Sequence, residues 1–226
     1  VHGVHCASMA LMMMIAHTTE EIKRYLIGQS FRSSEASTSV TVSHTRVSRR
    51  SLTLNLMKKF TDEFFQEIPK TDLHVHLDGS VRIETLIELA KEQNFVLPSY
   101  DPSTLKRTVF KKNYKNLEEY LEGFKYTSGV MQDEKSCERV AYEFAVDNYK
   151  EGVRYFEVRF APQLHASIDP DDCFGIREVL KSVDRGLKHA RDMFNRKLSE
   201  DKSRSKEPRY EYGIICCAMR KFFKGT

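Results

Sequence analysis

Hydrophobic and polar positions follow two alternating periods after residue 60 of this chain. Short apolar runs bounded by turn residues predict three β-strands, at residues 70–77, 153–160 and 210–218. Apolar residues spaced three and four apart predict the helices between them, at residues 83–94, 116–130, 137–151 and 170–190. Strands that alternate with long helices are typical of parallel βαβ units, in which helices cover the sheet. The pattern therefore predicts an α/β fold.

Residues with special backbone preferences mark several boundaries of these elements. Gly152 follows the third predicted helix, at a position where a left-handed residue is favoured. Asp169 and Pro170 are expected to cap and begin the last helix. Pro102 indicates a loop, and the charged residues 196–209 are expected to link the last helix to the last strand.

Three strands are too few to close an eight-stranded barrel, which takes about 250 residues. The last predicted strand would leave an open hydrogen-bonding edge and a bare apolar face. We therefore expect residues 60–226 to be the front part of a larger α/β fold.

Residues 1–59 lack the regular patterning and are expected to form a poorly ordered leader. The apolar run at residues 9–16 is short and has no basic stretch before it, so a secretory signal is not expected. Residues 22–59 are rich in Arg, Ser and Thr and poor in acidic residues, which leaves organelle targeting as a minor alternative.

Composition narrows the class of partner. The chain has 226 residues, of which 40% are hydrophobic and 30% charged, and its net charge of +4 is spread along the sequence. Because this charge is small and dispersed, we do not expect a nucleic-acid partner. We do not expect a membrane span either, since no apolar run reaches about 18 residues. The five cysteines lack disulfide-framework spacing, so we expect a reducing, cytoplasmic setting, with most of them in the core.

The first predicted strand ends in three residues whose side chains can bind a metal or a substrate, His74, His76 and Asp78. Gly79 follows them. Alternate side chains of a strand face the same way, so the two imidazoles and the carboxylate share one face. Two histidines can supply two of the three or more protein ligands that catalytic zinc usually takes. In parallel α/β folds, working residues lie at the carboxyl ends of strands, where this group sits.

Other candidate residues have simpler interpretations. Glu157 and Arg159 share a face of the second strand and are expected to form an internal ion pair. His165, in the loop after that strand, is expected to be solvated, and His189 to lie on a helix surface.

The sequence from Ile68 to Ser80, IPKTDLHVHLDGS, closely resembles the opening motif of adenosine deaminases, which are zinc-dependent purine hydrolases with a TIM-barrel fold. Residues 141–144, 152–162 and 214–220 resemble later segments of that family in the same order. The resemblance implies a partial TIM (β/α)8 barrel, with about the first three strands and an inserted helical lid.

The resemblance also implies roles for individual residues. His74 and His76 would bind Zn²⁺, His76 would also border the substrate, and Asp78 would hold the ribose 5′-hydroxyl. The predicted helix at residues 116–130 is similar to the apolar lid over the purine, although its apolar stripe could equally be a core stripe. The stripe consists of Leu117, Tyr120, Leu121 and Phe124.

The activity implied is hydrolytic deamination of adenosine and 2′-deoxyadenosine to inosine forms and ammonia, on a small-molecule purine nucleoside. The proton-donating glutamate of the family is expected beyond Thr226, so no catalytic acid is assigned within the chain. Two alternatives stay open: a truncated, inactive fragment, or a deaminase of an adenine nucleotide. Asp78 favours a nucleoside, because a carboxylate there would repel a phosphate. A monomer and an oligomer are both compatible with the sequence.

Overall fold

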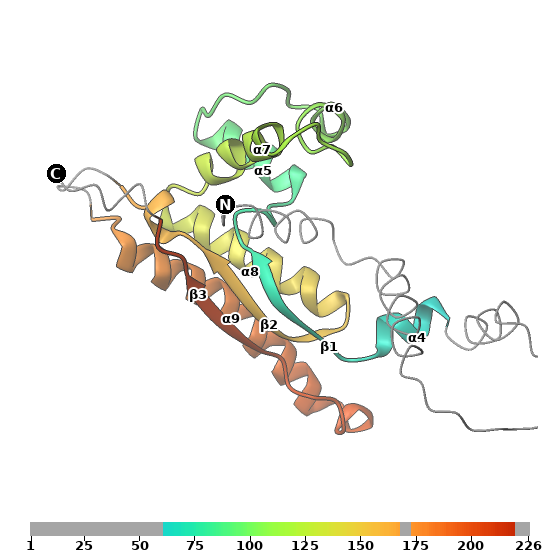
Figure 1. The fold of residues 1–226 in the computed structure, drawn as a ribbon. Coiled ribbons are helices and arrows are strands. Elements are labelled where there is room, and N and C mark those ends of the chain that lie inside the picture. The colour runs from blue at the N-terminus through green and yellow to red at the C-terminus, as the bar shows by residue number, and fades with distance from the viewer. Residues whose placement is uncertain (1–60, 168–172, 220–226) are drawn as a thin grey trace, which may run out of the picture. The chain divides into compact units, whose positions relative to one another are not determined.

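The computed structural model describes residues 61–167 and 173–219 (Figure 1). Among these, residues 69–219 belong to one compact unit, and residues 61–68, with the short helix α4 (Asp62–Glu67), belong to a second. The predicted leader, residues 1–59, and the Asp169–Pro170 pair lie outside the described residues. The larger unit holds the sheet and every candidate site residue.

Three parallel strands form the sheet of the larger unit, in the order β1 (Lys70–His76), β2 (Val153–Phe160) and β3 (Glu211–Cys216). The predicted ranges agree with these bounds to within two residues, and β2 agrees at both ends. The sheet and its covering helices confirm the α/β class and the partial TIM-barrel arrangement expected from the sequence.

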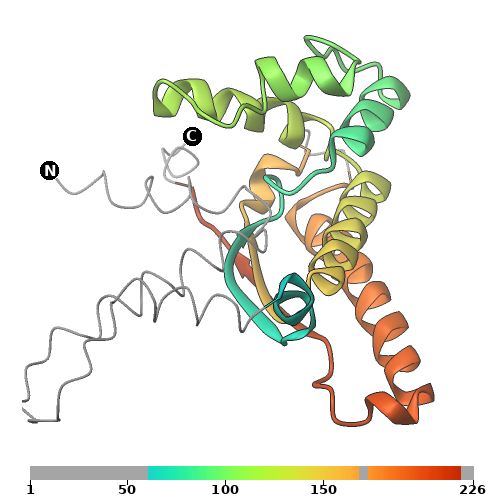
Figure 2. The same cartoon turned by 90° about the vertical axis from the view of Figure 1, so that its right-hand side faces the viewer.

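Helices α8 (Glu134–Lys150) and α9 (Ile176–Glu200) cover one face of this sheet, and Figure 2 shows both on the same side of the strands. The core lies between them and the strands, where apolar side chains of both layers are buried. The two helices approach closely at Gly186, where an added Cβ would lie 2.2 Å from the carbonyl oxygen of Glu138.

A helical segment is inserted between β1 and α8, as the resemblance predicted. It consists of α5 (Ile83–Glu92), α6 (Pro102–Thr108) and α7 (Leu117–Gly129), which gather above the ends of the strands in Figure 1. The segment rejoins the sheet layer through α8, whose start is fixed by a capping box between Asp133 and Ser136. No helix in the described part of the chain is both long and apolar enough to cross a bilayer.

Several sequence-based expectations about boundaries were wrong. The expected loop at Pro102 is the helix α6, because Asp101 caps it and a proline is tolerated in the first turn. The last long helix begins at Ile176, after the N-cap Gly175, and continues to Glu200 through part of the expected linker. Gly152 has the predicted left-handed conformation, with φ of 86°.

Candidate metal centre at the end of the first strand

A β-bulge in β1 decides which way its histidines face. Asp72 pairs with Phe156 and Val75 pairs with Val158, so Leu73 and His74 together oppose the single residue Glu157. Asp72 and Val75 are buried, whereas 55% of Leu73 is exposed and His74 is only partly buried. The bulge therefore lets His74 lie on the sheet face opposite the helices.

The two histidine rings lie close enough to share one ion. Their centroids are 5.7 Å apart and the ring planes are tilted by 49°. Two imidazoles on a tetrahedral zinc, with Zn–N bonds of about 2.0–2.1 Å, have ring centroids roughly 5 Å apart. The pair thus fits two positions of a zinc site, although no cluster of three or more metal-ligating side chains occurs among residues 61–167 and 173–219.

The surroundings of both imidazoles favour the form that binds metals. Burial lowers the pKa of His74, the Arg159 charge lowers it further, and Asp72 partly opposes the shift. Burial also lowers the pKa of His76, followed by the effects of His74 and Arg159. Neutral imidazole is the ligand form, so these shifts favour metal binding near neutral pH.

Asp78 presents a buried carboxyl group just beyond the strand. Only 5% of the residue is exposed, and burial raises its pKa to about 6 against the opposing N–H groups of Asp78 and Gly79. Its Oδ1 lies 3.9 Å from Nδ1 of His76 and has no hydrogen-bond partner within the described ranges. A donor such as a hydroxyl would satisfy this oxygen.

The turn that carries Asp78 is fixed by hydrogen bonds of its own. The Ser80 hydroxyl donates to the carbonyl oxygen of His76 at 2.6 Å, and the Ser80 N–H donates to Leu77 at 3.0 Å. The Leu77 N–H in turn donates to the Arg159 carbonyl of β2 at 3.1 Å. The carboxylate is thus mounted on a turn that is tied to the sheet.

The apolar stripe of α7 is divided between core and surface. Tyr120 is 5% exposed and packs edge-on against Tyr114 and Phe124. Burial raises the pKa of Tyr120 to about 12, with smaller contributions from Tyr114 and Asp78. Leu117 and Leu121 are 42% and 49% exposed. The core-stripe interpretation therefore fits Tyr120, while the two leucines remain available to cover a ligand.

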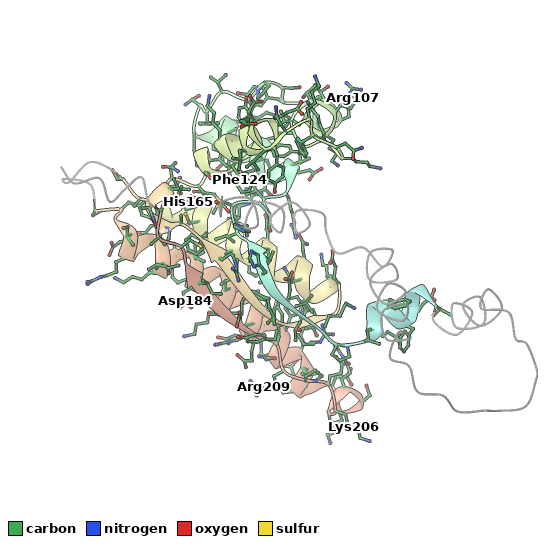
Figure 3. All side chains as sticks on the ribbon, viewed as in Figure 1. Arg107, Phe124, His165, Asp184, Lys206 and Arg209 are labelled. Carbon is green, nitrogen blue, oxygen red and sulfur yellow. The ribbon has the colours of Figure 1, made fainter. Side chains whose placement is uncertain are left out.

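Two of the simpler interpretations were wrong. His165 is fully buried after the short 3-10 helix η1 (Pro162–Leu164), because it packs near Phe160, and Figure 3 shows it near the ends of the strands. Glu157 accepts a hydrogen bond from the Tyr155 hydroxyl at 3.1 Å, while Arg159 donates to the Leu73 carbonyl at 2.9 Å. The ion pair expected between Glu157 and Arg159 is thus replaced by these two bonds. His189 is exposed, as predicted.

The cysteines were also partly misjudged. Of the four in the described residues, all of them free, Cys137 is buried, Cys217 is half-buried, and Cys173 and Cys216 are exposed. Cys137 lies at helical spacing from the apolar residues Val140 and Ala141, and all three are buried in α8.

Comparison with known proteins adds a family match. The family model described as adenosine deaminase matches residues 69–220. A probable adenosine deaminase of Dictyostelium discoideum is 43% identical over 131 residues, which are 58% of this chain and 16% of that protein. The adenosine deaminase of Shewanella woodyi is 41% identical over 132 residues, covering 58% of this chain and 39% of that protein. The chain spans less than half the length of these relatives.

Solved structures with similar folds include two of Arabidopsis ADAL. The complex with IMP has a TM-score of 0.45 and 28% identity, covering 57% of this chain and 36% of that one. The complex with GMP has a TM-score of 0.48 and 24% identity, covering 68% and 41% of the two chains.

Proposed function

The chain belongs to the adenosine deaminase family, and on that premise we propose that it carries the metal-binding and ribose-binding part of an adenosine deaminase. The enzyme would hydrolyse adenosine and 2′-deoxyadenosine to inosine forms and ammonia, with Zn²⁺ as cofactor. The observation that carries the proposal is the pair of adjacent imidazoles at the carboxyl end of β1, beside a buried carboxyl oxygen that has no hydrogen-bond partner in the described residues. That end of a parallel strand is where barrel enzymes place their working residues.

His74 and His76 would hold the ion through neutral imidazole nitrogens. Zn²⁺ held there would supply an activated water as the nucleophile at neutral pH. His76 lies between its partner histidine and Asp78, so its ring would also border the nucleoside. The residue would thus link the metal side of the site to the ribose side.

Asp78 would orient the substrate. Its buried Oδ1 would accept a hydrogen bond from the ribose 5′-hydroxyl, which replaces the partner that the oxygen lacks in the described residues. Correct orientation matters because the attacking water and the ring carbon must meet at reacting distance. This carboxylate would therefore determine where along the site the purine lies.

Helix α7 would cover the purine. Leu117, Leu121 and the partly buried Phe124 present apolar surface that a planar base could bury. Excluding bulk water in this way strengthens the electrostatic interactions of the site. Tyr120, packed against Phe124, would anchor this cover to the segment.

The test is an adenosine deaminase assay on the full-length protein, followed by loss of adenosine absorbance and release of ammonia. We expect the protein to turn over adenosine, a chelator to remove this activity and added zinc to restore it. The variant His76→Ala should abolish the activity. His189→Ala, which alters an exposed histidine, is the matched control and should retain activity. Turnover that survives His76→Ala, or the absence of turnover with zinc present, would refute the proposal.

A further inference from the structure

The bulge in β1 determines the orientation of both candidate ligands. Regular alternation from Asp72 onward would pair His74 with Val158 and His76 with Phe160, two positions buried under the helices. In the structure Val75 pairs with Val158, and His76 pairs with Arg159. One inserted residue therefore moves both imidazoles from the helix-covered face to the face opposite these helices.

Arg159 contacts the bulge directly. It is the register partner of His76, and its Nη2 donates to the carbonyl oxygen of Leu73, within the bulge, at 2.9 Å. Its Nε is buried and has no hydrogen-bond partner in the described part of the chain. The guanidinium thus spans from β2 to the irregular stretch of β1 that precedes both histidines.

The chemistry of this side chain limits what it can do there. A guanidinium stays protonated and has no acceptor, so it cannot be a metal ligand. Glu157, the residue of β2 that opposes the bulge, bonds to Tyr155. The described contact of the Arg159 side chain is therefore with the backbone of the bulge, which it can hold in one conformation through its planar donor group.

We propose that Arg159 is a positioning residue that clamps the β1 bulge, so that His74 and His76 are both directed at the same metal ion. The inference rests on the proposed function, because it assigns the two histidines to one ion. Groups that orient metal ligands without touching the metal typically contribute about ten- to hundred-fold to metal affinity. Loss of the clamp would let the bulge relax and separate the two imidazoles.

The experiment measures zinc affinity by competition with a chromophoric chelator, in full-length protein with wild-type sequence, Arg159→Met or Arg159→Lys. Arg154→Met is the matched control, because Arg154 lies on the same strand and donates to the carbonyls of Tyr149 and Val153, away from the bulge. We expect Arg159→Met to weaken zinc binding about ten- to hundred-fold. Arg159→Lys should give a smaller loss, since it keeps one donor but not the planar fork.

The melting temperature without zinc separates positioning from general stability. Arg154→Met should lower this temperature without changing zinc affinity, whereas the Arg159 variants should lose affinity even where they remain folded. If Arg159→Met does not fold, the Arg159→Lys variant decides the question. The inference would be overturned if the folded Arg159→Met variant, or Arg159→Lys where only that variant folds, bound zinc with wild-type affinity. It would also be overturned if the wild-type protein bound no zinc. A wild-type protein that binds zinc through His76 without deaminating adenosine would refute the proposed function and leave the clamp intact.

Discussion

At the level of single residues, burial shifts the pKa of groups near the carboxyl ends of the strands. His165 has no exposed surface, and neither ring nitrogen has a hydrogen-bond partner within the described ranges. Burial lowers its pKa to about 4, with a weaker opposing effect from the Met131 backbone. Asp78 shows the same effect with the opposite sign, since burial disfavours its ionised form.

The buried imidazole predicts a specific loss of stability in acid. Between about pH 6.5 and pH 4, His165 binds fewer protons in the folded protein than in the unfolded chain. Above about pH 6.5 the residue is neutral in both states and does not lower the free energy of unfolding, which falls as the pH drops from there towards about 4. The free energy of unfolding should decrease by about 3 kcal/mol over this range through His165 alone. Urea unfolding at both pH values measures it, and His165→Leu should remove that part of the slope. An unchanged slope in His165→Leu, with His189→Leu as the exposed control, would contradict this assignment.

Asp78 predicts a preference for nucleosides over nucleotides. A phosphate at the ribose 5′ position would lie against its buried carboxyl group, and such repulsion costs several kcal/mol at short range. We expect kcat/KM for adenosine to exceed that for adenosine monophosphate by about 100-fold or more. Asp78→Asn should narrow this ratio, because the repelling charge is removed while the side-chain size is kept. A wild-type enzyme that prefers the monophosphate would place Asp78 away from the 5′ position.

At the level of elements, close helix contacts and an exposed apolar helix face perform different tasks. Helices α8 and α9 pack tightly at Gly186, where the nearest backbone leaves no room for a side chain. Helix α7 instead leaves Leu117 and Leu121 42% and 49% exposed. The contact at Gly186 supports the layer that covers the sheet, and the two exposed leucines of α7 are free to contact a ligand.

Gly186→Ala should strongly destabilise the protein. Its Cβ would lie 2.2 Å from the Glu138 carbonyl oxygen and 2.9 Å from the Tyr142 nitrogen, so the two helices would have to separate. Overpacking of this kind costs about 3 kcal/mol, and we expect the melting temperature to fall by about 10 °C. In the control Gly175→Ala, the new Cβ would meet only an ordinary contact of 3.5 Å, with the Glu178 side chain. Equal melting temperatures for the two variants would show that α8 and α9 are less closely packed.

The lid role of α7 predicts a change in substrate binding. Leu121→Asn should raise KM for adenosine several-fold, with a smaller effect on kcat, because it replaces apolar surface that would cover the purine. Ile176→Asn is the matched control, since Ile176 is 50% exposed and Leu121 is 49% exposed. Steady-state kinetics of both variants provide the measurement. If both change KM equally, or neither does, α7 is not the lid.

The elements differ in how well the sequence predicted them, for physical reasons. Strand β2 was predicted at both ends because Gly152 and the apolar alternation mark it locally. Helix α6 was missed because a proline signals a helix start as well as a loop. The proximity of His74 and His76 follows from strand geometry, but the face they occupy depends on a bulge defined only by pairing with β2. The burial of His165 likewise depends on tertiary packing.

At the level of the whole molecule, a parallel sheet with helices on one face presents the candidate site at the carboxyl ends of its strands. The described residues include the two histidines that we propose as metal ligands and the carboxylate that we propose for the ribose. The chain belongs to the adenosine deaminase family, and its matched residues cover 39% of the Shewanella woodyi adenosine deaminase. The proton-donating glutamate beyond Thr226, the leader at residues 1–59 and the cytoplasmic location stay predictions. The metal half of the site is the part on which the rest of the account depends.

The most direct test of that part is an anomalous-scattering map at the zinc edge, from crystals of the full-length protein grown with zinc. We predict one peak within about 2.0–2.1 Å of an imidazole nitrogen from each of His74 and His76. A zinc peak bound by neither histidine, or no peak at the end of β1, would contradict it.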